Sequence, residues 1–203
     1  IARPFVGRVG AFRRTYDRRD FSISPPRATL LDRVVEAGIT VIGVGKIGDI
    51  FAHRGLTEER HTEGDMDGME RTIEAVKERQ AADSHALIFT NLVDLDMSYG
   101  HRRDARGCAG ALEAVDRRVP ELTGLLGPED MLIITGDHGC DPTTPSTDHS
   151  REYAPLLVFG PALKRGLDLG TRETFADLGC TLSRVFGLPR GRAGTSFLSS
   201  ITP

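Results

Sequence analysis

Short apolar runs alternate with amphipathic stretches along most of this 203-residue chain, and that alternation is the feature that most limits how it can fold. The apolar, strand-like runs are residues 40–44, 86–96, 131–135 and 154–160. Apolar residues at helical spacing cover residues 29–38, 66–80, 105–119 and 171–187. Strands that alternate with helices of about 10–15 residues form parallel sheets covered by helices. The sequence therefore predicts an α/β fold, a three-layer sandwich with a mostly parallel sheet.

Two of these helices carry specific expectations. Pro120 has no amide hydrogen, so it should break or kink the helix that precedes it. In the last helix, the spacing predicts that one apolar stripe faces inward, made of Phe175, Leu178, Leu182 and Val185.

Charge and composition exclude several classes of protein. The net charge of −3 gives no electrostatic footprint for nucleic acid or for a membrane surface. No apolar stretch approaches the roughly 18–20 residues that a membrane helix requires, and no secretory signal is recognisable. The three cysteines are far apart and odd in number, which does not suggest a disulfide framework. We therefore expect a cytoplasmic protein.

The first residues differ from the remainder of the chain. Residues 1–19 contain six arginines and a single acid, Asp17. The composition changes at Ser24-Pro25-Pro26, which predicts a boundary between segment 1–26 and a regular domain, 27–203. Such a basic run is most often solvated surface, and an anion site for a small phosphate is the alternative. Because the chain opens within an apolar run, we expect it to be part of a longer protein.

Acids and histidines gather where two of the apolar runs end. The first group comprises Asp94, Asp96 and His101, and the second comprises Asp137, His138, Asp141, Asp148 and His149. In open α/β sheets, ligands bind beyond the carboxyl ends of the strands. Carboxylate and imidazole groups suit divalent manganese, zinc, iron or magnesium. The groups exceed what one ion needs, so a pair of ions is plausible, as in many phosphoryl-transfer sites.

Simpler interpretations exist for single residues. Asp137 or His101 alone would be explained by a turn, and only the joint pattern at two strand ends favours a metal site. His53, His61 and His85 have no matching carboxylates and are interpreted as surface residues. The stretch "GVGKIG" fits a dinucleotide-binding pattern, but no helical periodicity follows it. The glycines of this stretch are better explained as turn residues. The functional alternative is that Lys46 contacts a phosphate.

Two long segments carry a family resemblance. "NLVDLDMSYGHRRD" and "GDHGCDPTTPSTDHSREYAPLLVFG" resemble signature segments of the phosphopentomutases, members of the alkaline phosphatase superfamily. "IARPFVG", "RRDFSISPP", "GVGKIGDIF" and "GTSFL" resemble the same family, in the C-terminal half of its chain. The resemblance implies that residues 27–203 are an incomplete alkaline-phosphatase-like metal core. Residues 1–26 would be the tail of a cap domain that closes over it.

The resemblance also implies an activity and its residues. Members of the family interconvert (deoxy)ribose 1-phosphate and (deoxy)ribose 5-phosphate, and they use two Mn²⁺ ions. By position, Asp96, His101 and His149 resemble the ligands of one ion, and Asp137 and His138 resemble part of the other set. Three further residues resemble groups that meet the sugar phosphate: Arg3, Arg18 and Lys46.

This chain departs from the family pattern in two ways. The family's phosphothreonine nucleophile belongs to the half that has no counterpart here, so the resemblance implies no catalytic nucleophile in this chain. Cys140 stands where an asparagine is expected. The open alternatives are another phosphohydrolase of the superfamily, a cofactor-independent phosphoglycerate mutase, or an inactive metal-binding fragment. The oligomeric state is not indicated.

Overall fold

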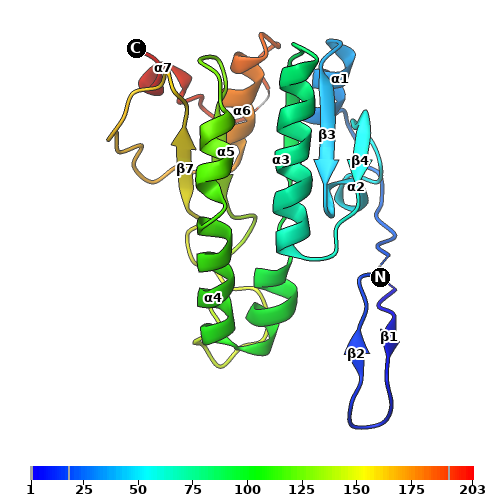
Figure 1. Cartoon of the computed structure of the whole chain (residues 1–203). Coiled ribbons are helices and arrows are strands. Elements are labelled where there is room, and N and C mark those ends of the chain that lie inside the picture. The colour runs from blue at the N-terminus through cyan, green and yellow to red at the C-terminus, as the bar shows by residue number, and fades with distance from the viewer. Residues whose placement is uncertain (1, 18, 192) are drawn as a thin grey trace.

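The computed structural model describes residues 2–17, 19–191 and 193–203, which form an α/β core and a projecting N-terminal arm (Figure 1). The strands are β1 (Phe5–Val6), β2 (Arg13–Arg14), β3 (Thr40–Val44), β4 (Glu58–Arg60), β5 (Ala86–Thr90), β6 (Leu132–Thr135) and β7 (Leu156–Phe159). The α-helices are α1 (Leu30–Glu36), α2 (Ile47–Ile50), α3 (Asp65–Ala81), α4 (Ala105–Asp116), α5 (Val119–Leu125), α6 (Ala176–Val185) and α7 (Leu198–Ile201). A π-helix, η1 (Leu95–Tyr99), and a 3₁₀ turn, η2 (Gly100–Arg102), lie between β5 and α4.

The central sheet is parallel, as the alternation predicted. Its strand order is β4-β3-β5, and β3 pairs in parallel with both neighbours. Val44 at the end of β3 lies opposite Arg60 on one side and Thr90 on the other, so the three carboxyl ends share one edge. The second sheet, β6–β7, is antiparallel and pairs Thr135 with Leu156.

Successive residues of β3 pack against helices on opposite faces of the sheet. Val41 packs with Leu31 and Val34 of α1. Its neighbour Ile42 packs with Ala75 of α3. Because successive strand residues point to opposite faces, α1 and α3 cover opposite sides of the sheet. The three-layer prediction is therefore confirmed.

The predicted helix is broken next to Pro120, as expected, and a second helix begins at Val119. The helix α4 ends at Asp116, and Pro120 lies in the first turn of α5. A first-turn residue needs no intrahelical amide partner, so proline is tolerated there. Leu122 of α5 packs on Met69 and Ile73 of α3, which holds the helix pair against the core.

The run 86–96 is not one strand, contrary to expectation. β5 ends at Thr90, where its partner β3 also ends, because Gly45 turns the chain away from the sheet with φ of +78°. The following residues enter the π-helix η1. A continuous apolar run has no period that separates a strand from a buried helix, which is why the sequence did not reveal this boundary.

The last helix is rotated relative to the prediction. Phe175 is 61% exposed and Val185 is 39% exposed, whereas the buried residues of α6 include Asp177 and Thr181. These polar side chains accept backbone amide hydrogens from the segment that leads to α7, from Thr195 and Phe197 respectively. Satisfied polar groups therefore turn the polar side of α6 inward. Part of its apolar stripe lines an open groove of about 910 Å³ beside β7.

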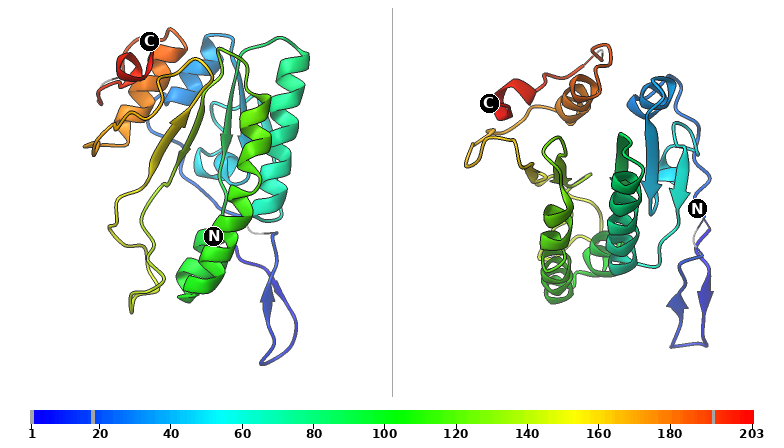
Figure 2. Two further views of the ribbon diagram at one scale, coloured as in Figure 1. Left: turned by 60° about the vertical axis from the view of Figure 1, so that its left-hand side comes forward. Right: turned by 45° about the horizontal axis from the view of Figure 1, so that its top comes forward.

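The tip of the N-terminal arm projects away from the core (Figure 2). It is an antiparallel hairpin, β1–β2, in which Phe5 and Phe12 meet edge to face at 5.1 Å between ring centroids. Arg54 donates to the carbonyl of Pro25 at 2.6 Å, which ties the junction after the arm to the core. Its identification as a cap-domain tail stays a prediction. Within the described residues, no helix is long and apolar enough to cross a membrane.

Candidate metal centre

The first component of the site follows β5. The chain leaves the sheet at Thr90, and η1 begins after Asp94 and carries Asp96. η2 follows at once and carries His101. Both residues therefore lie beyond the carboxyl ends of the parallel strands, on the side toward which the β3 arrow points in Figure 1.

The second component is a closed loop between β6 and β7. Gly139 and Ser150 form an antiparallel bridge, in which the amide of Ser150 donates to the Gly139 carbonyl at 3.0 Å. The bridge brings the adjacent residues His138 and His149 side by side. Their rings stack with centroids 3.7 Å apart and planes at 20°.

The loop is also attached to η2. Nδ1 of His101 lies 2.6 Å from the carbonyl oxygen of Thr147, and Arg103 donates to the Thr144 carbonyl at 3.0 Å. A proton on Nδ1 of His101 would make this hydrogen bond and leave Nε2 with a free lone pair. Nδ1 of His138 lies 3.2 Å from the Gly139 carbonyl oxygen, which permits the same arrangement.

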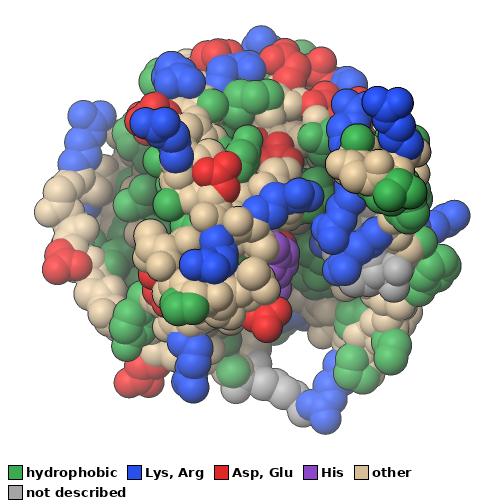
Figure 3. All heavy atoms as spheres, turned by 90° about the horizontal axis from the view of Figure 1, so that it is seen from below, with side chains coloured by type: hydrophobic (Ala, Val, Ile, Leu, Met, Phe, Trp, Pro, Cys, Tyr) green, Lys and Arg blue, Asp and Glu red, His purple; other side chains and the backbone are tan. Residues whose placement is uncertain are grey.

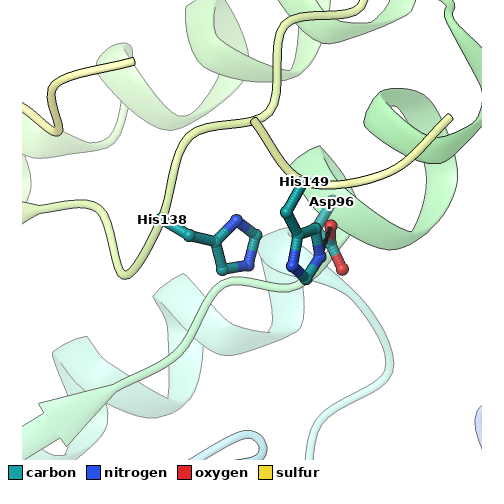
Figure 4. A group of neighbouring side chains, drawn as sticks. All are labelled: Asp96, His138 and His149. Carbon is teal, nitrogen blue, oxygen red and sulfur yellow. Dashed lines mark hydrogen bonds and ion pairs between the residues drawn. The ribbon is translucent and has the colours of Figure 1, made fainter. Parts of the chain in front are cut away.

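These contacts converge on one carboxylate oxygen. Oδ1 of Asp96 lies 3.1 Å from Nε2 of His149 and 3.2 Å from Nε2 of His101. One ligand atom each from Asp96, His138 and His149 lies within 4.8 Å of the others (Figure 4). An oxygen and several imidazole nitrogens at this spacing can surround a single divalent cation.

Other acids that follow β6 lie differently. The side chain of Asp137 is 66% exposed, with its carboxylate 3.6 Å from Nε2 of His138. The Asp141 carboxylate accepts the amide and the hydroxyl of Thr143 at 2.8 and 2.7 Å. These hydrogen bonds lower the pKa of Asp141 and give it a role in shaping the loop. Asp148 is exposed. The assignment of Asp137 and His138 to a second ion stays a prediction.

The three basic residues of the expected phosphate site are distributed as follows. Arg3 lies exposed in the arm, just before β1. Arg18 lies outside the described residues. Lys46 follows β3 at the same sheet edge as η1, and its Nζ is 3.3 Å from a carboxylate oxygen of Asp20. Their predicted contact with a sugar phosphate remains untested.

The site is open to solvent. The side chains of Asp96 and His149 are 33% and 49% exposed. Figure 3, which looks onto this end of the molecule, shows histidine in a recess with lysine and arginine side chains around it. Such exposure leaves room for a further ligand on a bound ion, as catalytic metal sites require. The groove beside β7 contains none of the clustered imidazoles.

Cys140 lies next to this centre, outside the group of three residues whose ligand atoms converge there. Burial raises the pKa of the Cys140 thiol, and the negative charge of Asp96 raises it further.

The sequence did not indicate one contact beside the site, between Asp65 and Asp94. Asp65, the first residue of α3, exchanges two hydrogen bonds with Asp94, the residue before η1. Asp65 is only 4% exposed. An acid at the start of a helix is common enough that its position alone gave no signal.

Known proteins resemble this chain closely over its whole length. The model of the Metalloenzyme superfamily matches residues 18–190. A phosphopentomutase from Anaeromyxobacter sp. (strain K) is 58% identical over 202 residues, which is 100% of this chain and 50% of that protein. A phosphopentomutase from Acetivibrio thermocellus is 52% identical over 201 residues, 99% of this chain and 51% of that protein.

The chain thus spans about half the length of the curated relatives that it matches. These matches confirm the resemblance to the C-terminal half of phosphopentomutases that the motifs indicated. Among solved structures, the PH0037 protein from Pyrococcus horikoshii matches with a TM-score of 0.46 and 21% identity. That match covers 63% of this chain and 39% of the other, and it is too weak to indicate a function.

Proposed function

Because the chain belongs to the Metalloenzyme superfamily, we propose that it forms the metal-binding part of a phosphopentomutase. Such an enzyme interconverts (deoxy)ribose 1-phosphate and (deoxy)ribose 5-phosphate. Identity of 52–58% to proteins named phosphopentomutase supports this over the whole chain. The observation that carries the proposal is the position of Asp96 Oδ1 within 3.2 Å of Nε2 atoms from two histidines.

The donor set fits the expected ion. One carboxylate and imidazole nitrogens suit Mn²⁺ and similar divalent ions. We propose that Asp96, His101 and His149 hold one Mn²⁺, and that Asp137 and His138 contribute to a second. Bound metal would neutralise charge on the phosphoryl oxygens of the substrate.

The protein's own groups would bind and orient the sugar phosphate. Arginine presents a planar fork of donors that matches phosphate, which supports Arg3 and Arg18 as phosphate ligands. Lys46 would exchange its ion pair with Asp20 for the substrate phosphate. The carbonyls that accept from His101 and His138 would hold both imidazoles in the tautomer with Nε2 free.

We propose that the nucleophile is a threonine outside these 203 residues, so this chain alone binds Mn²⁺ without interconverting pentose phosphates. Without a covalent acceptor, transfer of the phosphoryl group between two sugar hydroxyls loses its intermediate carrier. The three cysteines are free, which supports a reducing compartment such as the cytoplasm.

A chimaera tests the activity. Residues 1–203 replace the matching half of the Anaeromyxobacter phosphopentomutase, and ribose 1-phosphate conversion is measured with Mn²⁺. We expect turnover by the chimaera, loss of turnover in its Asp96→Ala variant, and unchanged turnover in His85→Ala, an exposed histidine just before the amino end of β5, the end opposite the site.

The same assay separates the alternatives. Release of inorganic phosphate without isomerisation would favour a phosphohydrolase, and turnover of 3-phosphoglycerate would favour the other mutase. Rapid isomerisation by the isolated 203-residue chain would contradict the missing-nucleophile proposal.

A further inference from the structure

We infer that Asp65 is a positioning residue for the metal centre, acting through Asp94 on the π-helix that carries Asp96. The inference rests on the metal site proposed above. It assigns a role to a buried carboxylate that is distant from the metal ligands in sequence and is not itself a ligand.

The first argument is the pattern of hydrogen bonds. The amide of Asp65 donates to Oδ2 of Asp94 at 2.8 Å, and the amide of Asp94 donates to Oδ1 of Asp65 at 2.8 Å. Each carboxylate thus accepts the backbone amide of the other residue. This reciprocal pair fixes both the direction and the spacing of the two chain segments, as a single hydrogen bond cannot.

The second argument is what the pair holds together. Asp65 begins α3, a 17-residue helix packed into the core through Met69 and Ile73. Asp94 immediately precedes η1, which has no buried residues of its own. The rigid helix therefore anchors a segment whose side chains are all only half-buried. Asp96 lies two residues beyond that anchor.

The third argument is that the neighbouring residues accommodate the Asp94 carboxylate. The hydroxyl of Ser98, inside η1, donates to the remaining oxygen of Asp94 at 3.2 Å. Gly64 precedes Asp65 with φ of +97°, and a Cβ atom there would lie 2.7 Å from Oδ2 of Asp94. The glycine thus leaves room for the Asp94 carboxylate to approach the start of α3.

The fourth argument is the energetic cost of the arrangement. Asp65 is 4% exposed, and its Oδ2 atom has no hydrogen-bond partner. A buried carboxylate with one oxygen unpaired destabilises a fold. Stability alone therefore does not account for Asp65, and orientation of η1 is the effect that its contacts can have.

The test compares variants of the 203-residue chain in two measurements. Mn²⁺ affinity is measured by titration calorimetry, and hydrogen exchange of the amides of residues 95–99 is measured in the metal-free chain. Asp65→Ala removes the acceptor for the Asp94 amide. We expect it to weaken Mn²⁺ binding about 10–100-fold, as loss of outer-shell partners does, and to accelerate exchange in η1. Asp65→Ser is a second variant. Its shorter side chain cannot reach the Asp94 amide, and serine is favourable at the start of a helix.

Asp65→Asn keeps the acceptor oxygen and removes the charge. We expect its Mn²⁺ affinity and its exchange in η1 to stay near those of the unmodified chain. Asp177→Ala is the matched control, because Asp177 is also a buried acid that accepts a backbone amide, at 2.7 Å from Thr195. It should lower the melting temperature without weakening Mn²⁺ binding.

Three results would overturn the inference: unchanged binding and exchange in Asp65→Ala and Asp65→Ser, weakened binding in Asp65→Asn, or equal weakening in Asp177→Ala. Failure of the metal site itself is distinguishable. In that case the unmodified chain binds no Mn²⁺ and Asp96→Ala changes nothing, while exchange in the metal-free chain still decides whether Asp65 holds η1.

Discussion

Nε2 of His149 lies 3.1 Å from Oδ1 of Asp96, although the two residues are 53 positions apart in the sequence. One comes from a loop between antiparallel strands, and the other comes from a π-helix after a parallel strand. Two different sheets therefore contribute to one cluster. A cation bound there would link them, so metal binding is expected to stabilise the folded chain.

Removal of the shared carboxylate should abolish most metal binding. Asp96→Ala deletes the oxygen that faces two imidazoles, and we expect Mn²⁺ affinity to fall by about 100-fold or more, beyond the effect of an outer-shell change. Asp148→Ala, at an exposed neighbour of His149, should change affinity by no more than about twofold. Calorimetric titration measures both. Equal affinity in the two variants would argue against the cluster as the binding site.

Asp65→Asn should stabilise the chain at neutral pH. Burial raises the pKa of Asp65 to about 6, the charge of Asp94 acts in the same direction, and backbone amides oppose it. The folded state thus binds this proton more tightly than the unfolded state. The contribution of Asp65 to stability is fully present below its unfolded pKa of 3.8 and is lost as pH rises through about 6.

The gain from Asp65→Asn should therefore depend on pH. It should reach up to about 3 kcal/mol above pH 7, because one pKa unit corresponds to about 1.4 kcal/mol. It should shrink toward zero near pH 3.5. Urea unfolding of both proteins across this range measures the difference, and a gain independent of pH would contradict the assignment.

Ile73→Ala should weaken the fold where three helices and a strand meet. Ile73 is 1% exposed and packs with Met69 and Leu122. Truncation removes buried apolar contacts and leaves a cavity, so the free energy of unfolding should fall by about 2–5 kcal/mol. Leu112→Ala, at a position 54% exposed on α4, should cost no more than about 0.5 kcal/mol. Chemical denaturation compares the two.

Two glycine-to-alanine substitutions should change the free energy of unfolding in opposite directions. Residue 64 has a positive φ, and the Cβ atom of an alanine there would lie 2.7 Å from a carboxylate oxygen of Asp94. Gly64→Ala should therefore destabilise the chain by about 1–3 kcal/mol. Gly110→Ala lies inside α4 with open space around its new methyl group, and should stabilise it by up to about 1 kcal/mol. Thermal unfolding distinguishes them. Loss of stability in both variants would show that α4 tolerates no added methyl group there.

The groove beside β7 should promote self-association of the 203-residue chain. Leu157 and Phe175 are 60% and 61% exposed and both line it. Contiguous exposed apolar groups favour association in water. Light scattering should reveal mass that rises with concentration, and Leu157→Ser combined with Phe175→Ser should reduce it. A monomer at all concentrations would contradict this expectation.

The sequence by itself determined the order of the main elements and the chemistry at their ends. Helix α1, strand β3 and helix α3 lie where periodicity predicted them, because local spacing decides which face of an element is apolar. The Asp and His residues also stood out in the sequence, since side chains able to bind metal are recognisable by type and by their place after a strand.

Tertiary structure decided the remainder. The run 86–96 became a strand and a π-helix because pairing with β3 ends at Thr90, which no local pattern encodes. α6 turned its polar face inward because distant backbone amides satisfy Asp177 and Thr181. The stacking of His138 on His149 and the bonding of Asp65 to Asp94 likewise depend on where separate segments meet. Contacts between distant segments depend on packing and on hydrogen-bond satisfaction across the whole fold. Periodicity depends only on residues that are close together along the chain.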